Sequence, residues 1–428
     1  MRTSKIFISF RFQLFGAIIL ASILPAFVRR NFDSDIFSSQ LQINTLVGTV
    51  VAIVVGYFFH RRISVIPGVK ADFYIIPIYA FSFYILVLVM FFARIDYTRA
   101  TLISGFFITI LWFQCIAVLS RRVREYSLAI VPGGDVEALV ELKGVRWISL
   151  SDMPTSHRGW DGLVADLRAD LSPQWIRFIS ETALAGTPVF HVKEIRESLT
   201  GMVEIEHLSE NTLGSLNPNE AYRELKHTLD WVIAFSALIA FLPIFAVISL
   251  LIKMDSSGPV LFRQERRGYR GKTFKVFKFR TMIAKQSGAG DVPAEVADME
   301  NVRDQARTKD QDMRITRVGR ILRRTRLDEL PQVLNIMRGE MSWIGPRPEA
   351  LVLSKWYEKE LPFYSYRHIV FPGITGWAQI NQGHVSAVED VHEKLHYDFY
   401  YIKNFSFWLD LIITMKTAKI IFTGFGSR

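Results

Sequence analysis

The chain has 428 residues, of which 50% are hydrophobic, and a formal net charge of +10 at neutral pH. This length exceeds what one hydrophobic core usually serves, so two or three structural units are expected. The single cysteine excludes a disulfide framework, which fits soluble parts that stay in a reducing cytosol. The positive charge could serve nucleic acid, anionic lipid or a phosphorylated substrate. No helix-turn-helix, zinc-binding or RNA-binding motif is present, so no nucleic acid partner is expected.

Four apolar stretches dominate residues 1–122 and predict transmembrane helices. Each approaches the roughly 17–25 residues that a helix needs to cross a bilayer. No small-residue cleavage site follows the first stretch, so we interpret it as a span and not as a signal peptide. Flanking basic residues, nine against four, favour both ends of this unit on the cytoplasmic side. The four stretches are Phe12–Val28, Leu46–Phe59, Phe73–Phe92 and Thr101–Leu119.

Residues 123–222 have a soluble composition and predict a small α/β domain. Runs rich in β-formers alternate with helical patterns, which is typical of a parallel sheet. The expected strands are Ser127–Pro132, Val145–Leu150, Leu163–Leu167 and Pro188–His191, and the expected helices are Val136–Lys143 and Pro173–Ala185. Gly133 and Gly134 follow the first strand, but the spacing of a dinucleotide fingerprint is missing. Nucleotide binding stays open, and an accessory or oligomerisation module is the favoured interpretation.

A different kind of membrane segment follows at residues 229–252. It is apolar and long enough to cross a bilayer, but Pro243 lies near its middle and removes the hydrogen bond to the carbonyl of Ile239. Basic residues flank both ends, which therefore favour the same, cytoplasmic face. We predict a re-entrant helix that breaks at Pro243 and returns. An ordinary proline-kinked spanning helix is the alternative.

A run of basic residues leads into two adjacent carboxylates, Asp328 and Glu329. Pro331 fits only the first turn of a helix and Gly339 reads as its C-terminal stop, so the carboxylates lie at a helix N-terminus. A helix cap is the simplest interpretation of such a pair. The arginine cluster before the pair and the rigid Pro-Arg-Pro turn after it instead favour phosphoryl transfer, which needs cationic donors and metal-capable carboxylates.

Two further basic patterns lead toward these carboxylates. Alternation along residues 275–280 places Lys278 and Arg280 on one side of an extended strand. An arginine stripe at helical spacing ends at Arg323. A surface that faces solvent or lipid headgroups is the simplest interpretation of both patterns. A substrate-binding surface competes with it, because the stripe points to Asp328.

The remaining C-terminal segments complete a mixed α/β domain over residues 223–428. Residues 286–312 are polar and predict a connection or lid, and Glu349–Glu360 and Glu393–Lys403 predict helices. The last helix, expected at Phe405–Phe422, is amphipathic and is suited to lie in the membrane interface. Its apolar residues are interrupted by Asp410, Lys416 and Lys419.

Four motifs in one order resemble the bacterial sugar transferases, that is, the monotopic polyprenol-phosphate phosphoglycosyl transferases. The resemblance covers residues 225–425. The N-terminal spans and the α/β insert resemble the larger members, which are hexose-1-phosphate transferases that start exopolysaccharide, capsule or O-antigen synthesis. The motifs are Lys278-Phe-Arg280-Thr281-Met282, Leu327-Asp328-Glu329-Leu-Pro331-Gln332, Gly345-Pro-Arg347-Pro348 and Pro372-Gly-Ile-Thr-Gly376-Trp377.

The resemblance implies an enzyme of the bacterial inner membrane whose catalytic domain lies on the cytoplasmic face. A UDP-sugar and undecaprenyl phosphate would give undecaprenyl-pyrophosphate-sugar and UMP. Asp328 would be the nucleophile that forms a phosphosugar–aspartate intermediate, and Glu329 would be a metal ligand or a base. The expected metal is Mg²⁺, held by Asp328 and Glu329. Glucose and galactose are the expected sugars, with N-acetylated sugars as the alternative.

The resemblance also implies which side chains bind the substrates. Lys278, Arg280 and Arg323 would hold phosphate oxygens. Arg347, fixed between Pro346 and Pro348, resembles the arginine that contacts the nucleotide. Gln264 and Arg266 are weaker candidates. The Asn-Gly-Arg that usually follows Trp-Ala-Gln is replaced by Asn381-Gln382-Gly383, so no role of that arginine is carried over. Assembly into a homo-oligomer is a possibility that the sequence leaves open.

Two other functions are weighed against this one. A glycosyltransferase of the same pathway would need an Asp-x-Asp metal motif and would release UDP, not UMP. Asp310 and Asp312 have that spacing but lie in the polar connection. A membrane scaffold that has kept the fold without the activity is the non-enzymatic alternative, and the joint presence of Asp328, Glu329 and Arg347 with the other cations argues against it.

Overall fold

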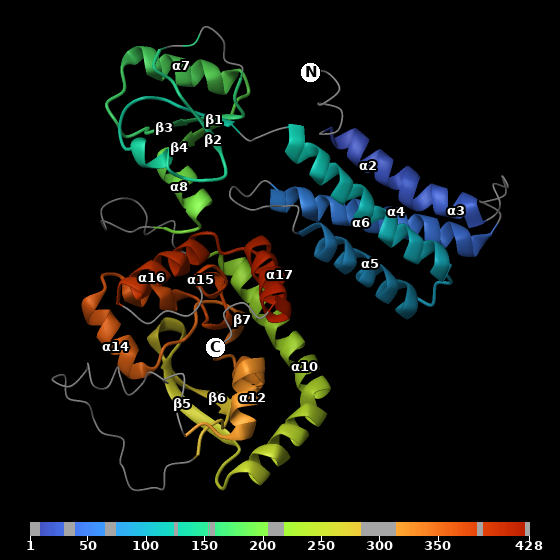
Figure 1. Cartoon of the computed structure of the whole chain (residues 1–428), viewed down its shortest axis with the longest axis vertical. Coiled ribbons are helices and arrows are strands. Elements are labelled where there is room, and N and C mark those ends of the chain that lie inside the picture. The colour runs from blue at the N-terminus through green and yellow to red at the C-terminus, as the bar shows by residue number, and fades with distance from the viewer. Residues whose placement is uncertain are drawn as a thin grey trace. The chain divides into compact units, whose positions relative to one another are not determined.

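A computed structural model describes residues 9–29, 39–64, 74–123, 127–152, 154, 159–203, 218–283, 314–382 and 388–423. The chain divides into two compact units, residues 1–201 and 202–428, which are described separately (Figure 1). The predicted polar connection at residues 286–312, with Asp310 and Asp312, lies outside the described residues.

The four predicted N-terminal spans are helices that are long and apolar enough to cross a membrane. The first is continuous from α2 (Phe10–Ile18) through a π-helical turn (Ile19–Ile23) to α3 (Leu24–Arg29), and it is followed by α4 (Gln40–Ser64), α5 (Ile75–Phe92) and α6 (Arg99–Val123). Helix α4 begins earlier than predicted. Its polar first turns are compatible with a helix because the hydroxyls of Thr45 and Thr49 donate to the carbonyls of Leu41 and Thr45, 2.8 and 2.7 Å away.

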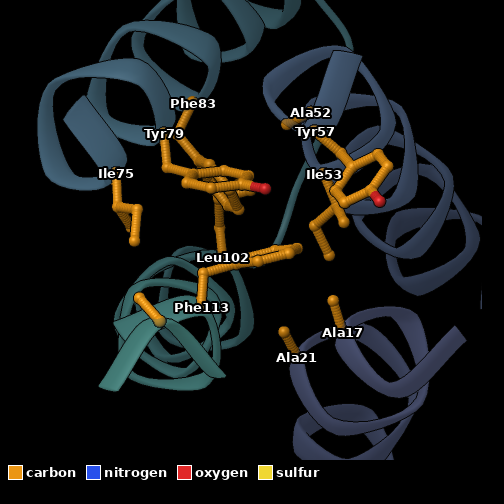
Figure 2. Packing of buried hydrophobic residues seen from close by; sticks show 11 residues of the cluster. Ala17, Ala21, Ala52, Ile53, Tyr57, Ile75, Tyr79, Phe83, Leu102 and Phe113 are labelled. Atoms are coloured by element: carbon orange, nitrogen blue, oxygen red, sulfur yellow. The ribbon is translucent and has the colours of Figure 1, made fainter. Parts of the chain in front are cut away.

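Aromatic and small residues form the core of this bundle (Figure 2). The ring of Tyr79 stacks on Phe113 with centroids 4.7 Å apart. Ala17 and Ala21 face this core with no exposed surface, and a Cβ on Gly105 would lie only 2.7 Å from the carbonyl oxygen of Ala21. These small residues let the helices approach closely, as membrane helices do. Large apolar side chains on the outside, such as Phe92 at 78% exposure, suit contact with lipid.

The α/β domain contains the predicted parallel sheet. The sheet has the order β2-β1-β3-β4, and every pair is parallel. Its elements are β1 (Ser127–Ile130), β2 (Arg146–Ser149), β3 (Gly162–Ala165), β4 (Val189–His191), α7 (Pro173–Leu184) and α8 (Val192–Thr200). The helix predicted at Val136–Lys143 is wrong except for a 3₁₀ turn at Glu137–Leu139. The N–H groups of Leu139 and Leu142 bond to carbonyls three residues back, a spacing that the apolar positions 136, 139 and 142 satisfy.

Gly133 and Gly134 have a structural explanation in this sheet. Gly134 has a φ of +72°, and a Cβ there would lie 2.3 Å from the Oδ2 of Asp166. The carboxylate of Asp166, which follows β3, accepts the backbone N–H groups of Asp135 and Arg168, both at 3.1 Å. These N–H groups would be the natural donors to a phosphate at the carboxyl edge of a parallel sheet. Asp166 already uses them, so nucleotide binding at this turn has no structural support.

The second unit is a mixed α/β domain, as predicted. It begins with α10 (Glu220–Asp255) and the antiparallel hairpin of β5 (Leu261–Arg267) and β6 (Thr273–Phe279). A short parallel pair joins β7 (Ser342–Ile344) to β8 (Gly373–Thr375). The other helices are α12 (Arg317–Thr325), α13 (Val333–Met337), α14 (Leu351–Glu360), α15 (Trp377–Asn381), α16 (Val388–Lys403) and α17 (Phe407–Thr423).

Helix α10 continues through Pro243 and bends, so the predicted break of the helix at Pro243 is wrong (Figure 1). Both of its ends pack on the same unit. Ala234 lies in a core with Val333 and Ile336 of α13, whereas Ile248 and Ile252 lie in a core with Phe279 and Leu322. The apolar side chains between these two contacts, including those of Ile239, Leu242 and Val247, are exposed.

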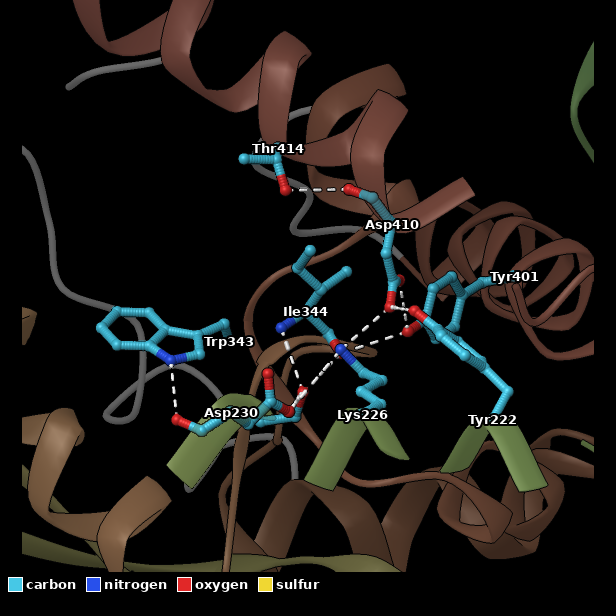
Figure 3. Close-up of polar contacts among 9 residues, drawn as sticks. Tyr222, Lys226, Asp230, Trp343, Ile344, Tyr401, Asp410 and Thr414 are labelled. Atoms are coloured by element: carbon cyan, nitrogen blue, oxygen red, sulfur yellow. Dashed lines mark hydrogen bonds and ion pairs between the residues drawn. The ribbon is translucent and has the colours of Figure 1, made fainter. Parts of the chain in front are cut away.

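A buried polar cluster ties α10 to α17 and β7 (Figure 3). The ammonium of Lys226 lies 2.9 Å from the carboxylate of Asp410, which also accepts hydrogen bonds from the hydroxyls of Tyr222 and Tyr401. The hydroxyl of Ser342 in β7 donates to Asp230 over 2.6 Å. Asp410 was expected to be one of the polar residues on an amphipathic surface helix. This expectation is wrong, because the lysine of α10 holds the carboxylate inside the unit.

Candidate active site

The carboxylate pair lies at the N-terminal turn of a helix, as predicted. Residues Leu327–Gln332 form a 3₁₀ turn that leads directly into α13. Pro331 has no N–H to donate to the carbonyl four residues back, so the α-helical hydrogen-bond pattern starts only after it. Gly339, with a φ of +70°, ends the helix. Arg326 adopts a left-handed φ of 57° and turns the chain between α12 and this segment.

Glu329 is held by two cations. Its Oε1 lies 2.9 Å from the Nζ of Lys278 and 2.6 Å from the Nη2 of Arg347, and its Oε2 lies 3.3 Å from the Nη1 of Arg347. Burial opposes ionisation of this carboxyl group, but the charges of Arg347 and Lys278 outweigh it and hold the pKa of Glu329 well below its usual range. Glu329 is therefore an ionised, fully engaged carboxylate.

Asp328 differs from Glu329 in its hydrogen bonds and in the direction of its pKa shift. Within the described part of the chain, no side chain or backbone N–H donates a hydrogen bond to its carboxylate. Burial, and secondly the negative charge of Glu329, raise the pKa of Asp328, and the cations Lys278, Arg323 and Arg347 lower it by less. A carboxylate that is more basic than usual and has no hydrogen-bond partner is suited to attack an electrophile.

Arg280 and Arg323 have partners other than the carboxylate pair in the contacts described for them. The Nε of Arg323 donates to the hydroxyl of Thr281 over 2.9 Å. Arg280, which is buried, donates through Nη2 to the carbonyl oxygen and hydroxyl of Ser256 at the end of α10, 2.6 and 2.9 Å away. Its Nε and Nη1 are buried and have no hydrogen-bond partner in the described part of the chain. Arg280 is the residue that follows β6. Unlike Lys278, it makes no described contact with Glu329.

Arg266 binds the Pro-Arg-Pro turn, and Gln264 binds Arg266. The guanidinium of Arg266 donates from Nη1 to the carbonyl oxygen of Pro348 and from Nη2, over 2.7 Å, to the side-chain oxygen of Gln264. Pro346 and Pro348 are both buried. In this structure the two polar side chains therefore support the turn that carries Arg347.

Several charged residues around this turn were missed. No role was predicted for Arg367, and Lys394 and Asp398 lie in the predicted helix Glu393–Lys403 without a role of their own. Lys394 forms an ion pair with Glu349, and Arg367 forms one with Asp398. Lys394 and Asp398 are separated by four residues, which places them on one face of α16. That spacing is visible in the sequence, but the partners lie about thirty to fifty residues away and become apparent only in the fold.

The carboxylate pair was the expected magnesium site. Among the described residues, no group of three or more His, Cys, Asp or Glu side chains could hold a metal ion. Mg²⁺ commonly binds through one or two carboxylates and the phosphate oxygens of a substrate. The oxygens of Asp328 fit this donor set, whereas those of Glu329 already accept from Arg347 and Lys278.

Comparisons with known proteins assign the chain to a family. The profile described as bacterial sugar transferase matches residues 221–424, which include every site residue above. A protein of Aeromonas hydrophila, the UDP-N-acetylgalactosamine–undecaprenyl-phosphate N-acetylgalactosaminephosphotransferase, is 40% identical over 411 residues, covering 96% of this chain and 94% of that protein. The chain therefore belongs to the bacterial sugar transferase family and is a membrane-associated phosphoglycosyl transferase.

Other relatives match about half of the chain. The UDP-glucose:undecaprenyl-phosphate glucose-1-phosphate transferase of Escherichia coli K12 is 40% identical over 208 residues, 48% of this chain and 41% of that protein. The exopolysaccharide production protein PSS of Rhizobium leguminosarum is 40% identical over 199 residues, 45% of this chain but 93% of that protein.

Proposed function

We propose that this enzyme transfers a sugar 1-phosphate from a UDP-sugar to undecaprenyl phosphate, giving undecaprenyl-pyrophosphate-sugar and UMP. This reaction would start the synthesis of a surface polysaccharide. The relatives named above act on these substrate classes according to their names. The observation that carries the proposal is the division within the carboxylate pair: Glu329 is saturated by cations, and Asp328 has no hydrogen-bond partner among the described residues.

Two displacements at one phosphorus atom would complete the reaction. An oxygen of Asp328 attacks the β-phosphorus of the UDP-sugar, and the bond to the bridging oxygen breaks with release of UMP. A phosphate oxygen of undecaprenyl phosphate then attacks the same phosphorus, and the bond to Asp328 breaks. The raised pKa of Asp328 supports the first step, because a more basic carboxylate is a better nucleophile. The partner-free oxygens of Asp328 support both steps.

The cations would neutralise and orient the phosphates. Arg347 uses two of its five N–H donors on Glu329 and keeps others for the donor nucleotide. The unpaired Nε and Nη1 of the buried Arg280 support a phosphate contact, and Arg323 lies close enough to Asp328 to lower its pKa. Mg²⁺ would supply further charge neutralisation at the diphosphate. The low pKa of Glu329 favours an anchor for Arg347 and Lys278 over a general base.

UDP-N-acetylgalactosamine is the sugar donor that we propose first. The relative named for that substrate matches 96% of the chain, whereas the relative named for glucose matches at the same identity over only 48% of it. UDP-glucose and UDP-galactose are the alternatives. Residues 123–222 would be an accessory or oligomerisation module.

The second unit would lie on the cytoplasmic face of the inner membrane, with α10 as a re-entrant helix. Both ends of α10 pack on this one unit, and the apolar middle is exposed, which supports entry and exit on the same face. A full crossing would place these two contacts on opposite sides of the bilayer. The depth of α10 would bring a membrane-bound polyprenyl phosphate to the level of Asp328.

Nucleotide release by the solubilised protein tests this function. The protein is incubated with Mg²⁺, undecaprenyl phosphate and each of several UDP-sugars, beside the variant Asp328→Asn. We expect UMP from one sugar and none from the variant, and a phosphosugar adduct on Asp328 when undecaprenyl phosphate is omitted. Release of UDP would instead indicate a glycosyltransferase. No release from any UDP-sugar would contradict the proposal.

A further inference from the structure

One face of α16 runs along the segment that carries Arg347. Lys394, Asp398 and Tyr401 have the spacing i, i+4, i+7, which places them in one stripe of the helix. We call these three residues the α16 stripe. Lys394 and Tyr401 contact the two ends of the segment Ile344–Glu349. Lys394 binds the carboxylate of Glu349. The hydroxyl of Tyr401 shares its one proton between two acceptors, the carboxylate of Asp410 at 2.9 Å and the carbonyl of Ile344 at 3.2 Å.

Arg367 connects the middle of the stripe to the middle of the segment. Its Nη2 donates to the carbonyl oxygen of Arg347 over 2.9 Å. The same guanidinium forms an ion pair with Asp398 at 2.8 Å and donates through Nη1 to the hydroxyl of Tyr364, also at 2.8 Å. Arg367 is 3% and Asp398 2% exposed, so this connection is buried. All three guanidinium nitrogens of Arg367 are engaged, which leaves the side chain one orientation.

The segment is also held from its other side. Arg266 donates to the carbonyl of Pro348, and the backbone N–H of Arg267 donates to the carbonyl of Glu349 over 3.3 Å. The carbonyls of Arg347, Pro348 and Glu349 therefore each accept a hydrogen bond from outside the segment. The backbone on either side of the Arg347 side chain is fixed, and a fixed backbone lets its guanidinium meet Glu329 with two parallel contacts.

We infer that Arg367 and the α16 stripe are positioning residues for Arg347. They set where its guanidinium meets Glu329 and the donor phosphates, and they contact no substrate themselves. The inference rests on the proposed function because it concerns the same active site. Charged residues far along the chain, not the two prolines alone, thus determine the geometry of the turn.

Arg367→Lys tests the inference, because a lysine keeps the charge near Asp398 but cannot bridge it to the carbonyl of Arg347 and to Tyr364. We expect kcat/KM to fall by about 100-fold, the size of effect that a misplacement of about 1 Å produces. The acid limb of the pH–rate profile should move to higher pH, because Arg347, once displaced, lowers the pKa values of Asp328 and Glu329 by less. Arg347→Lys added to Arg367→Lys should cost little more than either change alone.

Leu395→Ala is the matched control. Leu395 lies next to the stripe on α16 and is buried, so its truncation loosens the helix without removing a polar contact. We expect it to lower the melting temperature but leave the acid limb in place. Amide hydrogen exchange gives a second readout that needs no activity: residues 344–349 should exchange faster in Arg367→Lys and unchanged in the control.

The outcomes separate the inference from the proposed function. An inactive wild-type protein would contradict the proposed function, while the exchange measurement would still test the positioning role. An active wild type with an unshifted acid limb and unchanged exchange in Arg367→Lys would overturn the inference. A shift of equal size in Leu395→Ala would also overturn it, because loss of helix packing would then be sufficient.

Discussion

Arg347 holds Glu329 through two nitrogen–oxygen contacts, 2.6 Å from Nη2 to Oε1 and 3.3 Å from Nη1 to Oε2, across 18 residues of chain. This pair makes the two neighbouring carboxylates chemically different. Glu329 is ionised and bound, and Asp328 is more basic and has no hydrogen-bond partner among the described residues. The guanidinium of Arg347 thus gives the two adjacent carboxylates different roles, which their residue types alone do not reveal.

Arg347→Lys should separate charge from geometry at this site. Lysine keeps a positive charge but cannot contact both oxygens of Glu329, so we expect kcat/KM to fall by about 100-fold. The acid limb of the pH–rate profile should move to higher pH, because the pKa values of Glu329 and Asp328 increase. Arg338→Lys, at an exposed arginine that packs over the ring of Phe277, is the control. Equal kinetics in the two variants would contradict the role of Arg347.

His368 should make the second unit less stable in acid. Burial, and then the charges of Arg367 and Arg267, lower the pKa of His368 from 6.5 to about 3. The unfolded chain therefore binds a proton below pH 6.5 that the folded chain does not bind until about pH 3. Between these values this residue costs about 1.4 kcal/mol of stability per pH unit. Thermal unfolding should show a smaller loss on acidification in His368→Gln, and an identical slope would refute the assignment.

Gly134→Ala should destabilise the α/β domain. The new Cβ would meet the carboxylate of Asp166 at 2.3 Å and would also occupy a left-handed conformation, so a loss of more than about 1 kcal/mol is expected. Gly186→Ala, at a φ of +84° with no atom within 4 Å of its Cβ position, isolates the conformational cost alone. Limited proteolysis of the domain measures the difference. Equal susceptibility of the two variants would argue against the contact with Asp166.

Asp410→Asn should weaken the attachment of α10 to α17. Removing the carboxylate leaves the buried ammonium of Lys226 with only Asp230, 3.6 Å away, and such a loss costs about 3–5 kcal/mol. Thr414→Val, one turn further along α17, removes only a hydroxyl bond to the carbonyl of Asp410 and should have a small effect. Melting temperatures of the two variants in the same detergent provide the comparison. A larger loss in Thr414→Val would show that the ion pair does not stabilise the unit.

Pro243→Ala tests the origin of the bend in α10. The single native cysteine is replaced by Cys115→Ser, and one cysteine is introduced at a time by Glu220→Cys or Ser257→Cys. In the parent both positions should react with an impermeant reagent from the cytoplasmic face only. If Pro243 causes the re-entrant path, the variant should place one of the two positions on the opposite face. Unchanged labelling would show that the packing of both helix ends, not the proline, determines the topology.

Local patterns in the sequence determined much of this protein. Apolar runs longer than a bilayer is thick predict spans, because unpaired backbone groups are excluded from lipid and only a helix satisfies them. The four strands of the small domain and the helix start at the carboxylate pair follow from short-range alternation, proline and glycine, whose effects act within a few residues. The site residues Lys278, Asp328, Glu329 and Arg347 could be selected because their motifs are contiguous.

Only the tertiary structure decided what each charge contacts. Asp410 was assigned to a surface but lies inside the unit. The sequence does not show this, because its partner Lys226 is 184 positions away and no local pattern reveals it. Arg266 donates to the carbonyl of Pro348, and Asp398 is connected to Arg347 through Arg367. The periodicity of the sequence predicts on which face of its own helix or strand a side chain lies. Which opposite charge meets that face depends on how distant elements pack, and burial then makes the pairing obligatory.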